Sequence, residues 1–521
     1  MDILRWLIRL TFVHLPRGLF WAFATLFRTL LRSNRPTFGS ARWARASEIR
    51  QAQTFKDEGL IVGRVGRKLL RFNGDGVTLL FAKMRAGKGV GVVIPNLLEY
   101  PGSVICTDIK GENTAITCRH RQTFGPVFTL DLQDPDISNG WNPLDFIRVG
   151  TIHEVDDARM LAKLLVTPEA NGEDHWDKKA FNRLTGFLVY LVNKHQDNPL
   201  RRNLTELRRL VMLGPEALQD VLQEMAEHPR ETIHESANDM LRMAETDELP
   251  GVLSSMEKAT ELWSGDSPLA GIVGRSDFTL ESFAERVATL YVIVPEEKLT
   301  SYQPFLRLFS GLLLNALMRQ KDHRPKTKPL VLLDEAAALG HLAPLETGMG
   351  YLAEYARLLL VFQDLGQLDA IYRRSRSFIA NSACQIAFGV NDFETAEALS
   401  KRIGQITVHS HSEGRSKSPE SVFAHNQQAG EAEAGRWLID PSEILRMPRD
   451  EAVIFMQDQV AHPIRAKKVR YYEENRWKGL WDRWRDGGTV PFPSDASAPS
   501  GTAQAPGSRP EGDSAAGTHA A

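Results

Sequence analysis

The sequence predicts an α/β protein with a mostly parallel sheet and an all-helical region inserted into the chain. Short, apolar, β-branched runs recur with helix-like patterns between them. Their spacings are too long for hairpins and suit strands joined by crossover helices. Between residues 147 and 277 the strand-like runs stop, and one helical pattern follows another. Both observations favour a layered α/β domain interrupted by an all-α domain.

Length, charge and cysteine content narrow the class of protein. The 521 residues, 42% of them hydrophobic, are expected to form two or more globular domains. The 63 Lys and Arg nearly balance 65 Asp and Glu, so a nucleic-acid contact would need a local patch or an assembled channel. Cys106, Cys118 and Cys384 are far apart and form no CxxC pair. This pattern favours structural cysteines in a reducing compartment.

The amino-terminal segment is apolar but interrupted by cations. Its longest charge-free run, residues 18–27, would reach about 15 Å as a helix, against a bilayer core of about 30 Å. On a helix, His14, Arg17, Arg28 and Arg32 fall within one stripe. We therefore expect an interfacial helix lying on a membrane, with a single snorkelling span or a helix packed on a partner subunit as alternatives. A cleaved signal peptide is disfavoured because no small-residue cleavage site follows.

The elements expected after this segment follow from local pattern. Runs that are apolar on both faces predict buried parallel strands, here at residues 77–81, 103–108, 126–132, 288–295, 330–335, 358–363 and 384–390. Apolar residues spaced by three and four predict helices of the insertion, at residues 156–166, 178–195, 203–212, 215–228 and 236–245. The resulting segments are an amino-terminal membrane-associated helix (1–35), two parts of an α/β domain (36–146 and 278–487) that flank an all-α domain (147–277), and a disordered tail (488–521).

A candidate phosphate-binding loop, FAKMRAGKGVG, lies between the first strand-like run and a helical pattern. In that setting backbone N–H groups converge on an anion. Gly87 permits close approach of the backbone, Lys88 would neutralise the β and γ phosphates, and Arg85 adds positive charge. Ala82 replaces the usual first glycine, and Gly89 replaces the magnesium-binding hydroxyl residue. The candidate nucleotide-binding residues here are Ala82, Lys83, Met84, Arg85, Ala86, Gly87, Lys88, Gly89 and Val90.

Two later strand ends complete the predicted site. In PLVLLDEAAALG, Asp334 and Glu335 end an apolar run, where the first can hold the magnesium shell and the second can polarise an attacking water. Gln363 ends the next strand, where an amide can orient water or sense the γ phosphate. The alternative interpretation is that the two acids merely end a strand, and the presence of the phosphate loop disfavours it.

Several motifs together resemble the coupling proteins of type IV secretion and conjugation systems. The similarity extends in order over residues 38–472 and includes a helical insertion. Its motifs are FGSARWA, MRAGKGVGVVIPNLLEYPGSVICTDIKGE, GWNPLD, LLDEAAALG, FQDLGQLDAIY and IANSACQIAFGVNDFETAEALSKRIG.

This resemblance implies a RecA-like, P-loop ATPase at the cytoplasmic face of the bacterial inner membrane. Members of this family use ATP and Mg²⁺ and assemble as hexamers. They deliver a relaxase bound to single-stranded DNA, or an effector protein, to the subunits of a secretion channel. Matched by motif, Lys88 is the phosphate lysine, Asp334 the magnesium-shell acid, Glu335 the catalytic acid and Gln363 the following glutamine. Asp108, in DIKGE, is then an acid expected near the nucleotide.

The chain also departs from the family pattern. Lys83 and Met84 stand where Pro-Thr is usual, so one hydroxyl near the phosphates is lost. The family also has two membrane helices, for which this amino terminus lacks room. A nucleotide-binding cargo receptor or scaffold with little hydrolysis is therefore the alternative function.

Two further interpretations rest on the surrounding residues. A ring enzyme commonly receives an arginine from the neighbouring subunit, and Arg357, Arg373 and Arg374 are candidates for that role. His409 and His411 lie in a Ser-, Gly- and Glu-rich stretch, which favours a solvated loop over a metal site.

Overall fold

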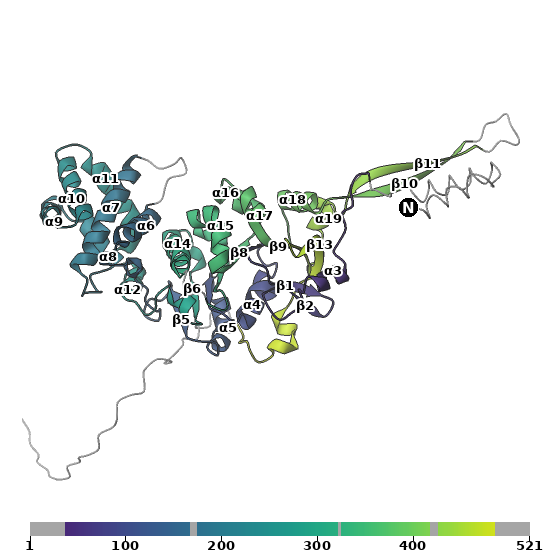
Figure 1. Cartoon of the computed structure of the whole chain (residues 1–521), viewed down its shortest axis with the longest axis horizontal. Helices are drawn as coiled ribbons and strands as arrows, with labels where there is room; N and C mark the ends of the chain where they lie inside the picture. Colours follow the sequence, from purple (N-terminus) through teal and green to yellow (C-terminus); the bar gives the residue numbers. More distant parts are fainter. Residues whose placement is uncertain (1–36, 167–174, 321–324, 417–425, 485–521) are drawn as a thin grey trace, which may run out of the picture.

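The computed structural model describes residues 37–166, 175–320, 325–416 and 426–484. Its central body is a large sheet covered by helices on both faces, with an all-helical domain at one end and a two-stranded arm at the other (Figure 1). The predicted amino-terminal helix and carboxyl-terminal tail lie outside the described residues. Within the described ranges, no helix is both long and apolar enough to cross a bilayer.

The central sheet has eleven strands among the described residues, in the order β2-β1-β13-β12-β9-β3-β8-β7-β4-β6-β5. Seven of them, from β9 to β5, run parallel. They are β3 (Val77–Ala82), β4 (Val104–Asp108), β5 (Val127–Asp131), β6 (Thr289–Ile293), β7 (Leu330–Leu333), β8 (Arg357–Phe362) and β9 (Ser382–Phe388). All seven strands predicted from the apolar runs are present in this parallel part.

The apolar character of these strands places the protein's main cores. Along β3, Val77, Leu79 and Phe81 enter one buried cluster, whereas Leu80 and Ala82 enter another on the opposite face. Alternation of side chains across a strand explains why both sets must be apolar when both faces are covered. The sheet is consequently buried, and its polar chemistry is confined to the ends of the strands.

Helices connect and cover the parallel strands. On one face lie η1 (Gly89–Val93, a π-helical turn), α4 (Ile94–Glu99) and α5 (Glu112–Arg121), which contribute to the same buried clusters as the central strands and β1 and β2. The other face is covered by α14 (Gln303–Arg319), α15 (Ala343–Tyr355), α16 (Leu365–Ile371), α17 (Ser375–Asn381) and α18 (Phe393–Ile403). Short connecting elements are α3 (Ala46–Gln51), η2 (Pro143–Phe146), α13 (Ser282–Glu285), η4 (Glu296–Lys298), η5 (Ala336–Leu339) and α19 (Pro441–Leu445).

An antiparallel extension of the sheet was not predicted. It consists of β1 (Leu60–Val65), β2 (Lys68–Phe72), β12 (Glu451–Met456) and β13 (Val460–Lys467). Strand β12 pairs antiparallel with β9, and β13 pairs antiparallel with β12. Two reversals restore the original direction, so the carboxyl end of β13 lies at the same edge of the sheet as the carboxyl ends of the parallel strands.

The inserted domain is all-helical, as the sequence predicts. The five predicted helices correspond to α6 (Glu154–Leu165), α7 (His175–Lys194), α8 (Leu204–Val211), α9 (Pro215–Ala226) and α10 (Glu231–Ala244). Three further elements, α11 (Leu249–Thr260), η3 (Glu261–Trp263) and α12 (Pro268–Val273), complete it. Asn203 caps α8 by accepting a hydrogen bond from the Glu206 backbone N–H, which ends the preceding turn and starts the helix.

A two-stranded arm projects from the opposite end of the body. Strands β10 (Gln405–Ser416) and β11 (Asn426–Trp437) pair antiparallel along their whole length. The interpretation of residues 409–411 as loop was wrong, because their backbone belongs to this ladder. Pairing with β11, the next strand along the chain, overrides the Ser- and Gly-rich local composition. Residues 39–41 hydrogen-bond to the base of β10, which joins the start of the described chain to the arm.

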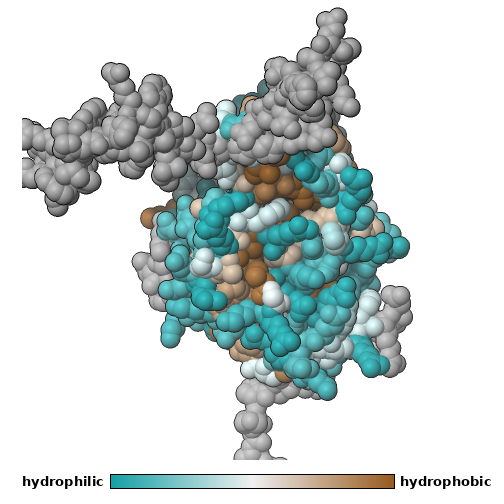
Figure 2. All heavy atoms as spheres, turned by 90° about the vertical axis from the view of Figure 1, so that its right-hand side faces the viewer, coloured by the Kyte–Doolittle hydropathy of each residue, from teal (hydrophilic) through white to brown (hydrophobic). Residues whose placement is uncertain are grey.

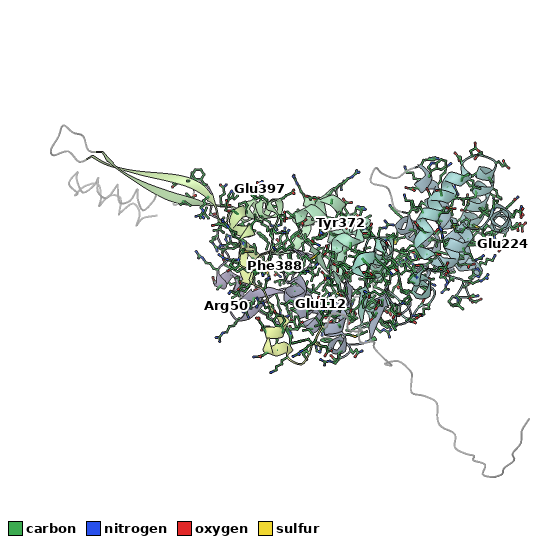
Figure 3. All side chains as sticks on the ribbon, turned by 180° about the vertical axis from the view of Figure 1, so that it is seen from behind. Arg50, Glu112, Glu224, Tyr372, Phe388 and Glu397 are labelled. Carbon is green, nitrogen blue, oxygen red and sulfur yellow. The ribbon has the colours of Figure 1, made fainter. Side chains whose placement is uncertain are left out.

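The face of the body that carries the arm is mostly hydrophilic. Figure 2 shows this face, with a strip of apolar side chains crossing it. Phe38 is 49% exposed and Val408 is 37% exposed, and both lie at the base of the arm, where the Phe38 backbone N–H donates to Thr407. The opposite end of the molecule is the helical domain, where Glu224 of α9 lies far from Phe388 in the sheet (Figure 3).

Candidate functional site

The GK-containing loop leaves the carboxyl end of β3 and enters the helix formed by η1 and α4. Ala82 is buried as the last residue of the strand, while Lys83, Met84 and Arg85 are exposed in a turn closed by a hydrogen bond from Ala86 N–H to the Lys83 carbonyl. Gly87 has a φ of 87°, a conformation that glycine adopts without strain. The strand, turn and helix are arranged as the sequence predicts for a phosphate loop.

The loop is packed tightly against the end of β9. Gly389 has a φ of 58°, and a Cβ atom built on it would lie 2.7 Å from the Cβ of Ala86. Such a contact is too short for any side chain, so the segment after β9 requires glycine at this position. Gly389 therefore allows β9 to support the loop from beneath.

Lys88 lies between the two acids of the predicted site. Its Nζ is 3.1 Å from Asp334 Oδ1 and 2.9 Å from Glu335 Oε2. All three side chains are 20% exposed or less. Although burial opposes the charged form, the two carboxylates together raise the pKa of Lys88. The ammonium group is thus held charged at the mouth of the loop by groups nearly 250 residues away in sequence.

Glu335 is oriented by two amides. Gln363 Nε2 donates to Glu335 Oε1 at 3.0 Å, and Gln367 Nε2 donates to the same oxygen at 3.3 Å. Gln367 also accepts a hydrogen bond from the Gln363 backbone N–H at 2.9 Å. Glu335 itself has a φ of 64°, which is uncommon for a residue with a side chain and is typical of functional sites.

Asp334 has one oxygen that suits a cation. Its Oδ1 atom is buried and has Lys88 Nζ as its ion-pair partner at 3.1 Å. Burial raises the pKa of Asp334, and Lys88 opposes this shift. Once an anion in the loop takes over Lys88, this buried carboxylate oxygen at a strand end fits a hydrated Mg²⁺, whose water ligands would satisfy it. Among the described residues, no group of three or more His, Cys, Asp or Glu is placed to hold a metal.

Asp108 lies beside this cluster and holds the start of α5. Thr114 donates both its backbone N–H and its hydroxyl to Asp108 Oδ2, each at 2.7 Å. Burial is the main reason that the pKa of Asp108 is raised to about 6, and the charge of Asp334 raises it further. The neighbouring Thr107 hydroxyl donates to the Asp334 carbonyl at 3.1 Å. The structure therefore places Asp108 near the nucleotide edge, with its described hydrogen bonds going to α5.

The arginine candidates are not brought to this cluster within one chain. Arg357 begins β8, at the opposite end of the strand from Gln363, and donates to the carbonyls of Phe72 and Gly74, each at 3.4 Å. Arg373 and Arg374 are exposed between α16 and α17. A role in a neighbouring subunit stays a prediction for all three.

Sequence reasoning missed two residues of the site. Gln367 lies three residues after Asp364, the N-cap of α16, and a Gln at that position commonly reaches back to the backbone before the helix, so this spacing was an available signal. Lys468, which follows β13, donates to the Ala86 carbonyl of the loop at 2.6 Å. No local pattern indicates this contact, because it depends on the antiparallel extension of the sheet.

The assembled groups can perform phosphate chemistry. A glycine-containing loop at a helix start binds an anion, a lysine neutralises its charge, and Asp334 offers an oxygen to a hydrated cation. Glu335, held by two amides, is placed to accept a proton from water. All of these groups lie at the carboxyl edge of the parallel strands, where open α/β sheets bind ligands.

The chain matches known proteins over most of its length. The family described as "Type IV secretory system Conjugative DNA transfer" matches residues 42–499. The conjugal transfer protein TraG of Escherichia coli is 30% identical over 460 residues, covering 80% of this chain and 72% of TraG. Protein VirD4 of Agrobacterium fabrum is 28% identical over 468 residues, covering 86% of this chain and 68% of VirD4.

Solved structures share the fold at lower identity. The bacterial conjugative coupling protein TrwB, lacking its first 70 residues, superposes with a TM-score of 0.60 at 16% identity, covering 84% of this chain and 96% of TrwB. TrwB in complex with ADP and Mg²⁺ superposes with a TM-score of 0.60 at 15% identity, covering 83% of this chain and 94% of that one. The sequence-predicted α/β, RecA-like P-loop fold with an all-α insertion is confirmed by this likeness.

Proposed function

The chain belongs to the type IV secretory system conjugative DNA transfer family, and from this premise we propose that it is an ATP-driven coupling protein. It recruits a relaxase bound to single-stranded DNA, an effector protein, or both, and powers their transfer to a type IV secretion channel. The single observation that supports this activity best is the hydrogen-bonded cluster of Lys88, Glu335 and Gln363 at the carboxyl edge of the sheet.

Hydrolysis would begin with an exchange of partners at Lys88. In the described chain its ammonium is neutralised by Asp334 and Glu335. Nucleotide phosphates entering the loop would take over that role, because they carry more negative charge and also receive the loop N–H groups. The exchange frees both carboxylates: Asp334 for the hydrated cation and Glu335 for a water molecule.

Glu335 then acts as the base. A water oriented by the Gln363 amide attacks the γ phosphorus, its proton passes to the Glu335 carboxylate, and the bond to the departing ADP oxygen breaks. Lys88 neutralises the charge that develops on the phosphate oxygens. Mg²⁺, when bound, supplies charge neutralisation between the phosphates. The TrwB complexes with ADP and Mg²⁺ and with a non-hydrolysable ATP analogue support ATP and Mg²⁺ as the cofactors.

Assembly and location form the less direct part of the proposal. A homo-hexamer at the cytoplasmic face of the inner membrane would place each site beside a neighbouring subunit, which can supply an arginine. Arg373 and Arg374 are exposed and available for this, whereas Arg357 is engaged by its own chain. The helical domain forms the end of the molecule opposite the arm (Figure 1), and the cargo contacts are assigned to it in this proposal.

ATP turnover with and without single-stranded DNA tests the proposed activity. We expect Lys88→Ala and Glu335→Gln to reduce turnover by about 100-fold or more, with Glu297→Gln as an exposed control that leaves it unchanged. Single-stranded DNA should stimulate the wild-type protein. Equal turnover for the wild type, Lys88→Ala and Glu335→Gln would contradict an ATPase.

One observation favours the alternative, a nucleotide-binding receptor or scaffold with little hydrolysis. Met84 is 58% exposed at the tip of the loop, beside the exposed Lys83, where family members usually have Pro-Thr. Replacing both residues by Pro-Thr would restore the missing hydroxyl. If the wild type binds nucleotide without turnover and the double variant hydrolyses ATP, the scaffold function is supported.

A further inference from the structure

A second lysine approaches the phosphate loop from the far end of the sequence. Lys468 immediately follows β13, whose carboxyl end lies at the nucleotide edge of the sheet. Its Nζ donates to the Ala86 carbonyl at 2.6 Å and lies 4.8 Å from the centre of the Phe388 ring. It is also the nearest atom to the position that a Cβ on Gly87 would occupy, at 3.9 Å. The ammonium is therefore at the loop itself.

The electrostatic surroundings of Lys468 differ from those of Lys88. Burial and the nearby Arg470 lower the pKa of Lys468, and Asp450 only partly opposes this. No carboxylate among the described residues forms an ion pair with Lys468, whereas its neighbour Lys467 pairs with Asp450 at 3.0 Å. A half-buried cation whose partners within the described ranges are a carbonyl and an aromatic face is short of negative charge. An anion bound by the adjacent loop would supply it.

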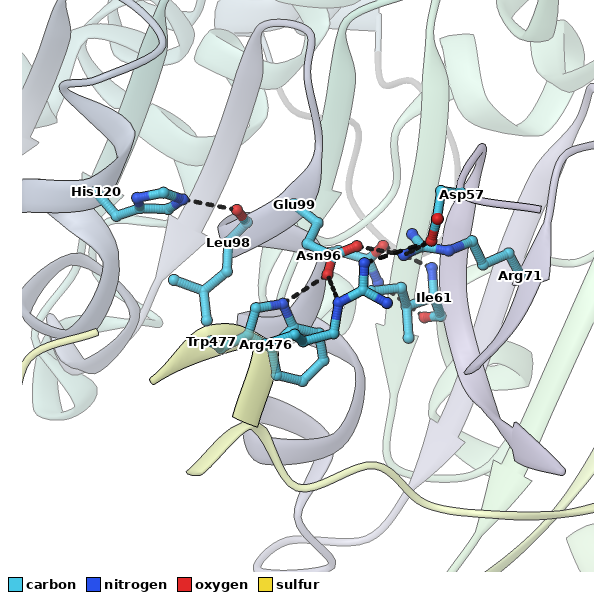
Figure 4. Close-up of polar contacts among 9 residues, drawn as sticks. All are labelled: Asp57, Ile61, Arg71, Asn96, Leu98, Glu99, His120, Arg476 and Trp477. Atoms are coloured by element: carbon cyan, nitrogen blue, oxygen red, sulfur yellow. Dashed lines mark hydrogen bonds and ion pairs between the residues drawn. The ribbon is translucent and has the colours of Figure 1, made fainter. Parts of the chain in front are cut away.

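The segment that carries Lys468 is fixed to the helix that follows the loop. We define the clasp as residues 468–484, which include η6 (Tyr471–Glu473) and η7 (Asn475–Trp477). Trp477 donates to Glu99 of α4 at 2.7 Å, and Arg476 pairs with the same carboxylate at 2.5 Å (Figure 4). Glu99 also pairs with Arg71 of β2, so one carboxylate joins the clasp, α4 and the antiparallel extension.

Apolar packing and a second polar contact complete the attachment. Val469, Tyr471 and Trp477 share a buried cluster with apolar residues of α4 and α5. Further along the clasp, Asp482 pairs with Arg119 of α5 at 3.0 Å. Burial of an aromatic and β-branched cluster on a helix opposes movement of that segment. Lys468 is consequently held beside the loop by a rigid backbone on both sides, because β13 precedes it and the clasp follows it.

We propose that Lys468 is a second phosphate-binding cation of the nucleotide site, presented to the loop by the clasp. This inference deepens the proposed function and rests on it, since it requires the loop to bind a nucleotide. Lys88 approaches the phosphates from within the loop, whereas Lys468 approaches from outside it. The ligand class is a nucleoside di- or triphosphate, and the group recognised is the phosphate chain.

Direct binding measurements on the whole chain test the inference. The probes are ADP with Mg²⁺ and inorganic pyrophosphate, measured by calorimetry for the wild type, Lys468→Gln and Lys468→Arg. Glutamine keeps an N–H donor for the Ala86 carbonyl but removes the charge, and arginine keeps both. We expect Lys468→Gln to lower the affinity for both ligands by about tenfold, which is the contribution of one charge-assisted contact. The affinities of Lys468→Arg should stay within about threefold of those of the wild type. The matched control Lys467→Gln should leave both affinities unchanged.

The outcomes separate this inference from the proposed function. Wild-type affinity for both probes in Lys468→Gln would overturn the inference and leave the ATPase intact. Loss of binding in Lys467→Gln as well would also overturn it, because the effect would then not be specific to the loop. If the wild type itself binds neither probe, the proposed function fails first. Trp477→Ala should also lower the affinity for ADP, because it detaches the clasp from α4. Thermal unfolding checks that this variant is folded.

Discussion

The two edges of the central sheet use charged side chains in opposite ways. At the carboxyl edge, the Glu335 carboxylate pairs with Lys88 and accepts a hydrogen bond from Gln363, so these contacts join one side chain to another. At the amino edge, Arg121 is fully buried and donates to the Tyr100 carbonyl at 2.5 Å and to the Gly102 carbonyl at 2.8 Å. Arg357, at the start of β8, likewise donates to the backbone carbonyls of Phe72 and Gly74.

The difference concerns which contacts a ligand can replace. A backbone carbonyl is fixed in place, and a buried carbonyl without a donor destabilises the fold. The hydrogen bonds at the amino edge are therefore structural and are not exchanged for a ligand. Ion pairs between side chains can be exchanged for an incoming anion of higher charge. The comparison predicts that substitutions at the carboxyl edge change function with little change in stability, and that substitutions at the amino edge do the reverse.

The largest expected effect is at the carboxyl edge. Glu335→Gln should reduce the rate of ATP turnover by about 10³-fold, because it removes the base while keeping the size of the side chain. Its midpoint of thermal unfolding should remain close to that of the wild type. Steady-state turnover together with a thermal scan checks this, and a large drop in stability would break the distinction between the two edges.

At the amino edge, Arg121→Met should lower the free energy of unfolding by about 3 kcal/mol, because two buried carbonyls lose their donor. Burial lowers the pKa of Arg121 to about 10, and it forms no ion pair with the described carboxylates, so the expected loss comes from its hydrogen bonds and not from a broken ion pair. Gln122→Met, at the exposed residue that follows Arg121, is the control. Urea unfolding of both variants measures the difference, and equal midpoints would show that Arg121 is not an anchor.

A smaller effect is expected for the second amide on Glu335. Gln367→Ala should lower kcat about tenfold with an unchanged KM, since Gln367 orients the base through Glu335 and through the Gln363 backbone. Asp369→Ala, exposed on the same helix, is the matched control. A rise in KM at constant kcat would instead indicate that Gln367 contacts the nucleotide.

The smallest expected effect distinguishes two roles for Arg357. As an amino-edge anchor, Arg357→Met should lower the free energy of unfolding by about 1 kcal/mol, because its contacts are long and half-buried, and leave ATP turnover within about threefold. Turnover lower by about 100-fold with unchanged stability would give Arg357 the role in a neighbouring subunit that the sequence suggested.

The contrast also shows where sequence reasoning was sufficient. The phosphate loop, Asp334, Glu335 and Gln363 were identified as one candidate site because each ends a strongly apolar run, and parallel strands bring their carboxyl ends to one edge. The five helices at the start of the insertion were predicted because their apolar periodicity is local. The strands of the antiparallel extension and arm were not, because their sequences are mixed and not continuously apolar, so the local pattern is weak and pairing with partner strands decides their structure.

By itself, the sequence determined the family, the α/β class, the loop and the acids that follow β7. These depend on local periodicity and on motifs in a set order, both of which are properties of the linear chain. Only the tertiary structure decided that Arg357 lies away from the candidate site, that Gln367 shares Glu335 with Gln363, and that Lys468 reaches Ala86. Strand order and direction decide which ends of distant segments meet, and the pairings that set them are made across hundreds of residues.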